Sequence, residues 1–335
     1  MEMRYTLRQK AGVVALDLPR YVGHLAGRKG WVLLRNRADA LERAPGGPGV
    51  ACQAEFSSDL HACHVFPCLG AWALRRALAQ WPLRMAEAPP PLAAAPDLTF
   101  VIPHWGHGRL PLLAATVRSI HAQEGVSAEC VIVDQNAVPE ALALPQGVRR
   151  VHTPDAPSEG SRSRAFNAGV REARADIVVC HDGDMLAPAA YGREILRWLR
   201  DGGCEVVHLQ RFLFCLGQSD SELLMSGGAV PSQCRPERVR QNWQGGTVAI
   251  RRDSYIRIGG FDESFVGWGG EDREFYDRCR DLKGWRHGYL PFIHLWHAPA
   301  AGKEGPERER NLAHMRARLS VPRAERVEAL RSQWA

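Results

Sequence analysis

Residues 177–184, IVVCHDGD, join an apolar run to two aspartates that are separated by a glycine. An apolar run of this length, followed by turn-forming residues, predicts a buried strand over 177–181. Asp182 and Asp184 then lie where the strand ends, and paired carboxylates there offer the oxygen ligands that Mg²⁺ or Mn²⁺ prefers. The tripeptide alone is also common in solvated turns. The sequence on either side of this segment is therefore needed to distinguish a metal-binding pair of carboxylates from a solvated turn.

Short apolar runs alternate with helix-patterned segments on both sides of this stretch. Strands are predicted over 98–103 (LTFVIP), 130–134 (CVIVD), 148–152 and 205–209, and helices over 110–123, 162–175 and 191–200. This alternation predicts an α/β fold with a mostly parallel sheet flanked by helices. Ligands bind such sheets beyond the carboxyl ends of the strands, which is where Asp134, Asp182 and Asp184 fall.

Glycine-rich segments follow in the C-terminal half. They are Gly245-Gly246-Thr247, Gly259-Gly260-Phe261-Asp262 and Trp268-Gly269-Gly270-Glu271-Asp272. Paired glycines let the backbone approach a ligand closely or hinge over it. Carboxylates at the start of a helix are favoured by its dipole, but this does not explain a tryptophan and so much glycine beside them. Farther on, His294 and His297 have a spacing that serves either a metal ion or a satisfied core histidine.

A proline-rich segment divides the chain. Residues 86–96, AEAPPPLAAAP, are typical of a linker. We therefore expect a small separate N-terminal domain of unknown role over 1–85, with a helix over 71–81. A catalytic domain is expected over 97–302 and a basic helical tail over 303–335.

The composition excludes several classes of protein. The 335 residues are 45% hydrophobic, which is ample for a packed core, and neither a transmembrane run nor a signal peptide is predicted. The net charge of +6 lies in the flanks, +4 over 1–97 and +3 over 303–335, whereas the middle carries −1. This distribution excludes a basic surface built for nucleic acid.

Nine cysteines in such a chain indicate reduced thiols and a cytoplasmic location. One group combines thiols and imidazoles: Cys52, His61, Cys63, His64 and Cys68. It lacks a Cys-X-X-Cys pair, so buried thiols beside surface histidines are favoured over zinc ligands. Whether this group binds a metal stays open.

In this order, these blocks resemble glycosyltransferase family 2 of the GT-A fold, over about residues 97–300. The C-terminal half resembles the corresponding region of β-1,4-galactosyltransferases and chondroitin-type synthases, most specifically in GGFDESFVGWGGEDREF at 259–275. The resemblance implies a GT-A, Rossmann-like sheet. It also implies metal-dependent, inverting transfer of a hexose (Gal, GalNAc, Glc or GlcNAc) from a UDP-sugar to a hydroxyl acceptor, in bacterial glycan or glycoconjugate biosynthesis.

The resemblance also implies roles for single residues. Asp272 would be the catalytic base with Glu271 beside it, and Asp184 and His297 would bind Mn²⁺ or Mg²⁺, with His294 the less favoured ligand. The residues implied to bind the nucleotide sugar are Pro103, Asp134, Arg164, Asn167, Asp182, Gly183, Gly246 and Trp268. Two features depart from the family pattern: HWGHGR follows the first strand, and the Arg–Asn spacing around Arg164 is loose.

Other functions stay open at this point. A retaining glycosyltransferase of similar fold is one alternative, although Asp272 after Glu271 favours the inverting group. A nucleotidyltransferase would have a glycine-rich basic loop after its first strand, which PHWGHGR matches poorly. A catalytically silent module that binds a nucleotide sugar or a glycan is a further alternative. Such a module would not need the two aspartates at 182 and 184, the Glu271-Asp272 pair and the later histidine.

The expected partners are a UDP-sugar donor and a carbohydrate, lipid-linked or peptide acceptor, without nucleic acid. Residues 308–331 mix arginines with apolar residues. They either pack on the catalytic body, which is favoured, or make peripheral contact with anionic lipid at the inner face of the membrane. The donor sugar, the acceptor and linkage, and the oligomeric state, including a homo-oligomer, stay open.

Overall fold

A seven-stranded sheet forms the centre of the protein in this computed structural model, which describes residues 5–26, 30–35, 39–52, 62–136, 146–153, 160–242, 245–298 and 305–334. The strand order is β12-β8-β11-β6-β3-β4-β5. The strands are β3 (Leu98–His104), β4 (Ala128–Asp134), β5 (Val148–His152), β6 (Ile177–His181), β8 (Val206–Val207), β11 (Thr247–Arg251) and β12 (Gly284–Trp285). The strands β6, β3, β4 and β5 run parallel, and β11 is antiparallel to β6 and β8. The predicted α/β fold with a mostly parallel sheet is confirmed.

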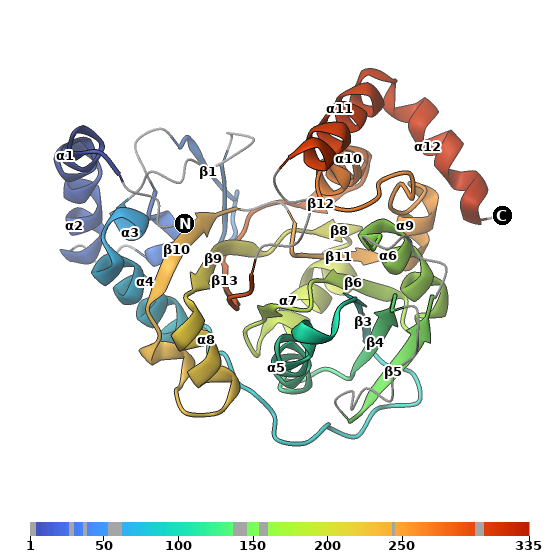
Figure 1. Ribbon diagram of the computed structural model, residues 1–335, viewed down its shortest axis with the longest axis horizontal. Coiled ribbons are helices and arrows are strands. Elements are labelled where there is room, and N and C mark those ends of the chain that lie inside the picture. Colours follow the sequence, from blue (N-terminus) through green and yellow to red (C-terminus); the bar gives the residue numbers. More distant parts are fainter. Residues whose placement is uncertain are drawn as a thin grey trace.

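Helices cover both faces of this sheet, as Figure 1 shows. Successive side chains of β3 point to opposite faces of the sheet, so they pack in two different cores. Phe100 packs in one cluster with residues of α5 and α7. Val101 packs in another cluster with residues of α6, α9 and α10. The helices are α5 (Leu110–His121), α6 (Arg162–Glu172), α7 (Tyr191–Leu196), α9 (Arg252–Arg257) and α10 (Glu271–Arg278). Every residue of β3 and β4 is buried, which agrees with their continuous apolar sequence.

A second sheet of four strands, in the order β10-β9-β13-β7, lies beside the first. Its strands are β7 (Met185–Leu186), β9 (Gln210–Leu216), β10 (Pro236–Gln241) and β13 (Leu290–His294), and α8 (Gln218–Met225) follows β9. The strand β9 pairs antiparallel with β10 and parallel with β13, and β13 pairs antiparallel with β7. The strand predicted over 205–209 is confirmed in part as the two-residue strand β8, whereas β9, which follows it in the second sheet, was not predicted.

The N-terminal region packs on the second sheet. It contains α1 (Leu7–Leu16), α2 (Leu18–Ala26), β1 (Leu41–Arg43), β2 (Val50–Cys52), α3 (Ala62–Val65) and α4 (Pro67–Gln80). Its buried residues share one hydrophobic cluster with β9, β10 and β13, and the rings of Trp31 and Phe212 lie 5.6 Å apart. Residues 82–97, which include the predicted linker, hold no helix or strand.

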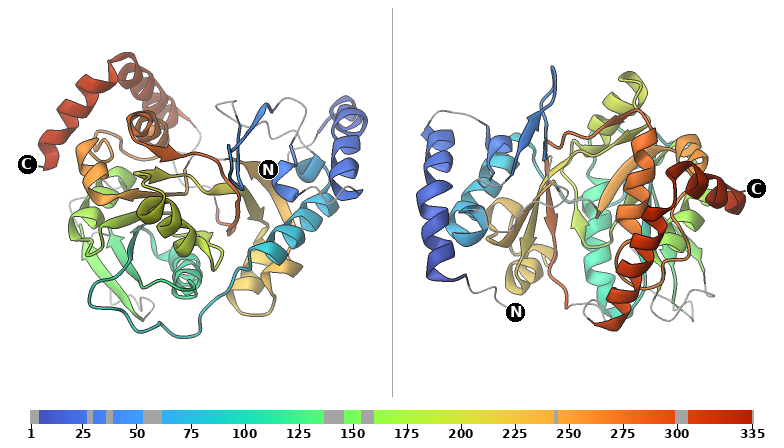
Figure 2. Two further views of the ribbon diagram at one scale, coloured as in Figure 1. Left: turned by 180° about the vertical axis from the view of Figure 1, so that it is seen from behind. Right: turned by 90° about the horizontal axis from the view of Figure 1, so that it is seen from above.

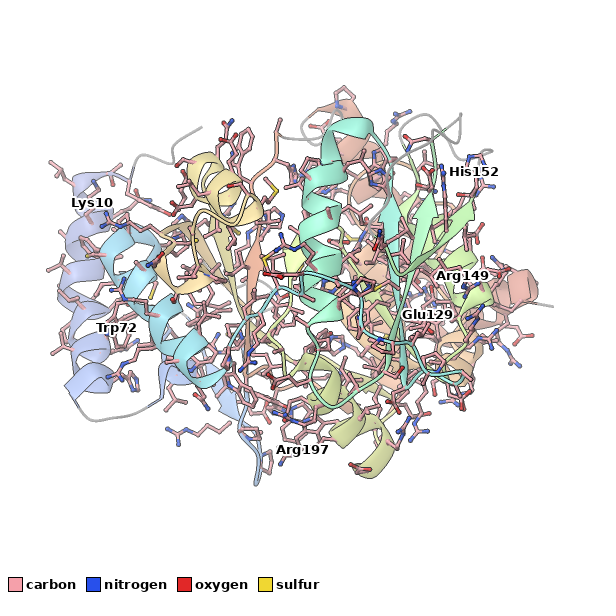
Figure 3. All side chains as sticks on the ribbon, turned by 90° about the horizontal axis from the view of Figure 1, so that it is seen from below. Lys10, Trp72, Glu129, Arg149, His152 and Arg197 are labelled. Carbon is pink, nitrogen blue, oxygen red and sulfur yellow. The ribbon has the colours of Figure 1, made fainter. Side chains whose placement is uncertain are left out.

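The two ends of the molecule are seen in Figure 3. Lys10 and Trp72 mark the N-terminal helices at one end, and Glu129, Arg149 and His152 mark the β4–β5 edge of the seven-stranded sheet at the other. The Arg149 Nε donates to Glu129 Oε1 over 3.0 Å and thereby joins β5 to β4. The residues described below lie between these two ends.

The C-terminal helices α11 (Pro306–Ser320) and α12 (Arg323–Arg331) pack against α10 and lie away from the N-terminal helices (Figure 2). Arg326 is 2% exposed and donates to Glu274 over 2.6 Å, and Glu274 also pairs with Arg278 at 2.6 Å. The basic residues of this segment thus include buried partners of the α10 carboxylates, as expected for packing on the catalytic body. No helix in the described residues is both long and apolar enough to cross a membrane.

Candidate active site

A cavity of about 890 Å³ is lined by residues of both sheets, by the first turn of α10 and by α11. It lies where the parallel strands β3 and β6 end, the position predicted for a ligand. Of the residues assigned from the sequence, the cavity is lined by Pro103, Asp182, Gly183, Asp184, Gly246, Trp268, Glu271, Asp272 and His297. At Gly246, φ is +81° and a Cβ would lie 2.3 Å from Met185 Sδ, so only glycine fits there.

Asp184, His294 and His297 form a group that could hold a metal ion, because one ligand atom from each lies within 4.8 Å of the others. Asp184 Oδ2 is 3.1 Å from His297 Nε2, and Asp184 Oδ1 is 3.7 Å from His294 Nε2. His294, which the sequence made the less favoured ligand, therefore belongs to the group. Two imidazoles and a carboxylate fit a divalent transition metal such as Mn²⁺ better than Mg²⁺, which prefers oxygen ligands only.

Positive charge surrounds the Asp184 carboxylate. Arg109 Nη1 lies 3.4 Å from Asp184 Oδ2, and its Nη2 lies 3.2 Å from His297 Nδ1. Burial alone would raise the pKa of Asp184, but His294, His297 and Arg109 lower it well below its usual value. The carboxylate is therefore ionised and suited to hold a cation or to face a bound anion through Arg109.

Arg162 joins three carboxylates at the bottom of the cavity. It begins α6 after the N-cap residue Ser161. Its Nε donates to Asp182 Oδ1 over 2.8 Å, and its Nη1 contacts both Glu271 Oε1, at 3.3 Å, and Asp272 Oδ1. One guanidinium thus links the Asp-Gly-Asp segment to the first turn of α10.

The two carboxylates of α10 differ in exposure. The Glu271 side chain is 8% exposed, and its Oε2 accepts a hydrogen bond from the Gly269 N–H over 3.1 Å. Burial, and then the charge of Asp272, raise the pKa of Glu271 to about 7, although Arg162 acts in the opposite direction. The Asp272 side chain is 28% exposed and is the more accessible of the two. Asp272 is thus open to a substrate, whereas Glu271 stabilises the loop.

The loop before α10 is held by α11. Asn311 Nδ2 donates to the carbonyl oxygens of Val266, at 2.8 Å, and Trp268, at 3.0 Å. Gly270 has φ +96°, and a Cβ there would lie 3.0 Å from the Cβ of Met315. The residue Trp268 is 38% exposed at the cavity. A segment that the sequence placed in a tail therefore positions the tryptophan loop.

Asp134 does not lie at the cavity as the resemblance implied. Its side chain is fully buried at the end of β4, where it pairs with Arg150 and accepts hydrogen bonds from Asn136 N (3.0 Å) and Nδ2 (2.7 Å). Although burial raises its pKa, these two partners lower it below the usual value. Asp134 is not among the described residues that line this cavity, and its role in binding the nucleotide stays a prediction.

Arg164 and Asn167 are also outside the lining that the described residues form. The Arg164 side chain is 42% exposed and lies 3.8 Å from Glu263. Asn167 is buried, donates to the Phe261 carbonyl oxygen over 2.8 Å and accepts from the Tyr255 hydroxyl over 2.7 Å. The assignment of these two residues to the donor stays a prediction, and Arg162, two positions before Arg164, is the arginine of α6 that lines the cavity.

The cysteine–histidine group of the N-terminal region has a structural role in the parts described, while His61 lies outside the described residues. Cys63 is buried and contacts the Leu69 carbonyl oxygen at 3.7 Å. His64 packs edge-on against Tyr5 at 5.5 Å, and burial lowers its pKa to about 4. Among the described residues, the side chains close enough to share a metal ion are Asp184, His294 and His297, and none of these cysteines is among them.

Family comparisons agree with this architecture. The family described as glycosyl transferase family 2 matches residues 99–257, and the family described as the N-terminal domain of galactosyltransferase matches residues 229–289. The two matches overlap and together run from β3 to the start of β13. No curated protein sequence matches the chain significantly.

Two solved structures with similar chains are of the Drosophila β1,4-galactosyltransferase 7. One is its catalytic domain with xylobiose, 16% identical over 64% of this chain and 79% of that one, with a TM-score of 0.41. The other is a mutant with manganese, UDP-Gal and xylobiose, 15% identical over 64% and 78%, with a TM-score of 0.39. By these two family matches, the chain is similar to glycosyltransferases of family 2 over residues 99–257 and to galactosyltransferases over residues 229–289.

Proposed function

We propose that this glycosyltransferase transfers a hexose of the galactose type from a UDP-sugar to a hydroxyl of a saccharide acceptor, with inversion at the anomeric carbon. The observation that carries the proposal is the Arg162 guanidinium, which binds Asp182 and Asp272 together. This pairing places the Asp272 carboxylate in the same cavity as Asp184 and the two histidines near it. The galactosyltransferase match over residues 229–289 supports the type of sugar.

The donor diphosphate would lie beside Asp184. Asp184, His294 and His297 would hold a divalent cation such as Mn²⁺, which when bound neutralises charge on the leaving diphosphate. Arg109 has its guanidinium at the same carboxylate and can donate hydrogen bonds to phosphate oxygens. The ends of β3 and β6 would then support the nucleotide side of the donor.

Asp272 is the residue proposed to accept the proton of the acceptor hydroxyl. Its greater exposure gives a hydroxyl access that Glu271 does not offer, and its Oδ1 is paired with the Arg162 guanidinium. As the proton passes to Asp272, the hydroxyl oxygen forms a bond to the anomeric carbon while the bond from that carbon to UDP breaks on the opposite face. Attack from that side inverts the configuration.

The tryptophan loop would limit hydrolysis of the donor. Trp268 lines the cavity, and the guanidinium of Arg308 lies 5.7 Å from the centroid of its ring. Because Asn311 holds the backbone of this loop, Trp268 is positioned to cover a bound sugar and exclude water.

The test is transfer from UDP-Gal, UDP-GalNAc, UDP-Glc and UDP-GlcNAc to saccharide acceptors with Mn²⁺ present, with the product configuration determined by NMR. An inverted product is expected from one of these donors. Asp272→Asn should lower kcat about 10²- to 10⁴-fold, because the general base is lost, while UDP binding persists. The matched control is Glu309→Gln, which removes an exposed carboxylate of α11. A retained configuration, or normal transfer by Asp272→Asn, would contradict the proposal.

A cytoplasmic location in glycan or glycoconjugate assembly is part of this proposal. The nine cysteines are free, and several, such as Cys130 and Cys180, are buried thiols of the kind that reducing compartments maintain. Met315 and Leu330 of the C-terminal helices are buried in the protein, which favours packing over insertion into lipid. Cell fractionation before and after a high-salt wash tests the location and any peripheral membrane contact.

A further inference from the structure

The cavity wall formed by β10 carries two arginines for which the transfer described above has no role. Arg238 and Arg240 lie two residues apart on this strand, so their side chains share one face, and both line the cavity. Both are partly buried. Each therefore contributes part of its surface to the cavity wall.

The register of the second sheet places these arginines relative to the metal-ligand group. Arg238 pairs with Cys215 of β9, and Cys215 pairs with His294 of β13. Cross-strand partners share a face, and neighbouring strands are about 4.8 Å apart, so the backbones of Arg238 and His294 are about 10 Å apart. Arg240 lies in the next row of that face, opposite Leu213. The arginines thus lie two strands away from His294, along the same wall.

The two guanidinium groups are close enough to affect one another. Burial, and then the charge of Arg240, lower the pKa of Arg238 to about 10, with Tyr5 acting in the opposite direction. Arg308 of α11 adds another positive charge to the lining of the same cavity. Like charges brought together in a partly buried wall are stabilised when an anion binds between them.

The donor diphosphate has a different place. It would lie at Asp184 and Arg109, toward the ends of β3 and β6, whereas β9 and β10 extend from β13 in the other direction. We propose that Arg238 and Arg240 bind an anionic group of the acceptor, a phosphoryl or a carboxylate next to the sugar that receives the hexose. This inference rests on the proposed function and adds the chemical class of its acceptor.

The test compares three acceptors that differ in charge: a neutral hexoside, the corresponding glycosyl phosphate, and a disaccharide that ends in a hexuronic acid. The double variant Arg238→Gln/Arg240→Gln is expected to lower kcat/KM for the anionic acceptor about 10- to 100-fold, the range for losing hydrogen bonds to a charged group. The KM for the UDP-sugar and the transfer to the neutral hexoside should not change. The anionic acceptor whose kcat/KM falls in the double variant, the glycosyl phosphate or the uronic acid disaccharide, identifies the anion that the arginines bind.

Controls separate the inference from folding and from the proposed function. Arg235→Gln removes the same charge from an exposed residue outside the cavity, and Arg238→Lys/Arg240→Lys should keep part of the preference for the anionic acceptor. Calorimetric binding of the glycosyl phosphate and the uronic acid disaccharide, without donor, decides the inference even if no transfer is found. Equal losses on all three acceptors, or a loss confined to the donor KM, would overturn it.

Discussion

Arg162 shows how much of this site depends on the direction of one side chain. On a helix, residues four apart share a face, and the Arg162 guanidinium lies 4.8 Å from the centroid of the Phe166 ring. Arg164, two positions later, points to a different side of α6 and pairs at the surface with Glu263. Both arginines lie in the first turn of α6, so which of them faces the cavity depends on how the helix packs and not on a local sequence signal.

Glu271 makes a pH-dependent contribution to stability that can be measured. Its pKa is raised from about 4.5 to about 7 on folding, so between these values the folded protein binds more protons than the unfolded chain. Stability from this group is therefore present at low pH and is lost as the pH rises through about 7. Glu271→Gln removes this term, and we expect it to increase the free energy of unfolding at pH 8 by about 1 kcal/mol relative to the wild type.

Thermal unfolding of wild type and Glu271→Gln between pH 5 and pH 8 measures this difference. The Tm of the variant should increase relative to the Tm of the wild type as the pH rises, by roughly 2 °C at pH 8. Glu309→Gln is the exposed control and should follow the wild type. Parallel curves for Glu271→Gln and the wild type would show that Glu271 is ionised throughout this range.

At the scale of elements, α11 links the C-terminal segment to the catalytic loop. The sequence predicted a basic helix, because arginines and apolar residues alternate there, but the pattern does not show which neighbour the helix packs on. The structure pairs Asn311 with two loop carbonyls and places Met315 against Gly270. The helix is therefore part of the site.

Replacement of Asn311 by alanine tests this role. The loss of the amide leaves two carbonyl groups without their donor, at a cost of about 1–3 kcal/mol. We expect kcat/KM for transfer to fall at least about tenfold and hydrolysis of the donor to increase relative to transfer, because Trp268 is no longer positioned. Arg310→Ala, an exposed change on the same helix, should keep the wild-type ratio. An unchanged ratio in Asn311→Ala would remove α11 from the mechanism.

The elements differ in how readily the sequence predicts them. β3, β4 and β6 consist mainly of apolar residues, as expected for strands that helices bury on both faces. β7 has only two residues and β10 contains three charged residues among six, so neither carries a strand pattern, whereas β8 lies within the strand predicted over 205–209. β7 and β10 exist through pairing with strands distant in the sequence, which a local pattern does not record.

On the scale of the whole molecule, the metal-ligand group connects the two sheets. Asp184 follows β6 of the seven-stranded sheet, and His294 ends β13 of the four-stranded one. Mn²⁺ should therefore stabilise the folded protein as a unit, by about 2.7 kcal/mol when its concentration is 100 times the Kd. A rise in Tm with Mn²⁺ is expected in the wild type and not in Asp184→Asn. A smaller rise with Mg²⁺ is expected because two of the ligands are imidazoles.

The shared core makes a prediction for the N-terminal region. Residues 1–85 cover Phe212, Phe214 and Val239, none of which has exposed surface. Their exposure would cost about 1.5–3 kcal/mol each, a sum comparable with the stability of a whole domain. A chain that begins at residue 86 should therefore be insoluble or bind a hydrophobic dye. A soluble chain with a cooperative unfolding transition would show that residues 1–85 are a separate domain, as the sequence predicted.

The sequence alone establishes the buried parallel strands, the carboxylates and histidines at their ends, and the resemblance to family 2, because these features are local runs and fixed spacings. It does not establish that Arg162 rather than Arg164 lines the cavity, that His294 joins Asp184, or that Asp134 is buried away from the cavity. Nor does it show that α11 holds the tryptophan loop. Each of these depends on which face of an element meets a partner far along the chain, and that choice is made by packing between elements.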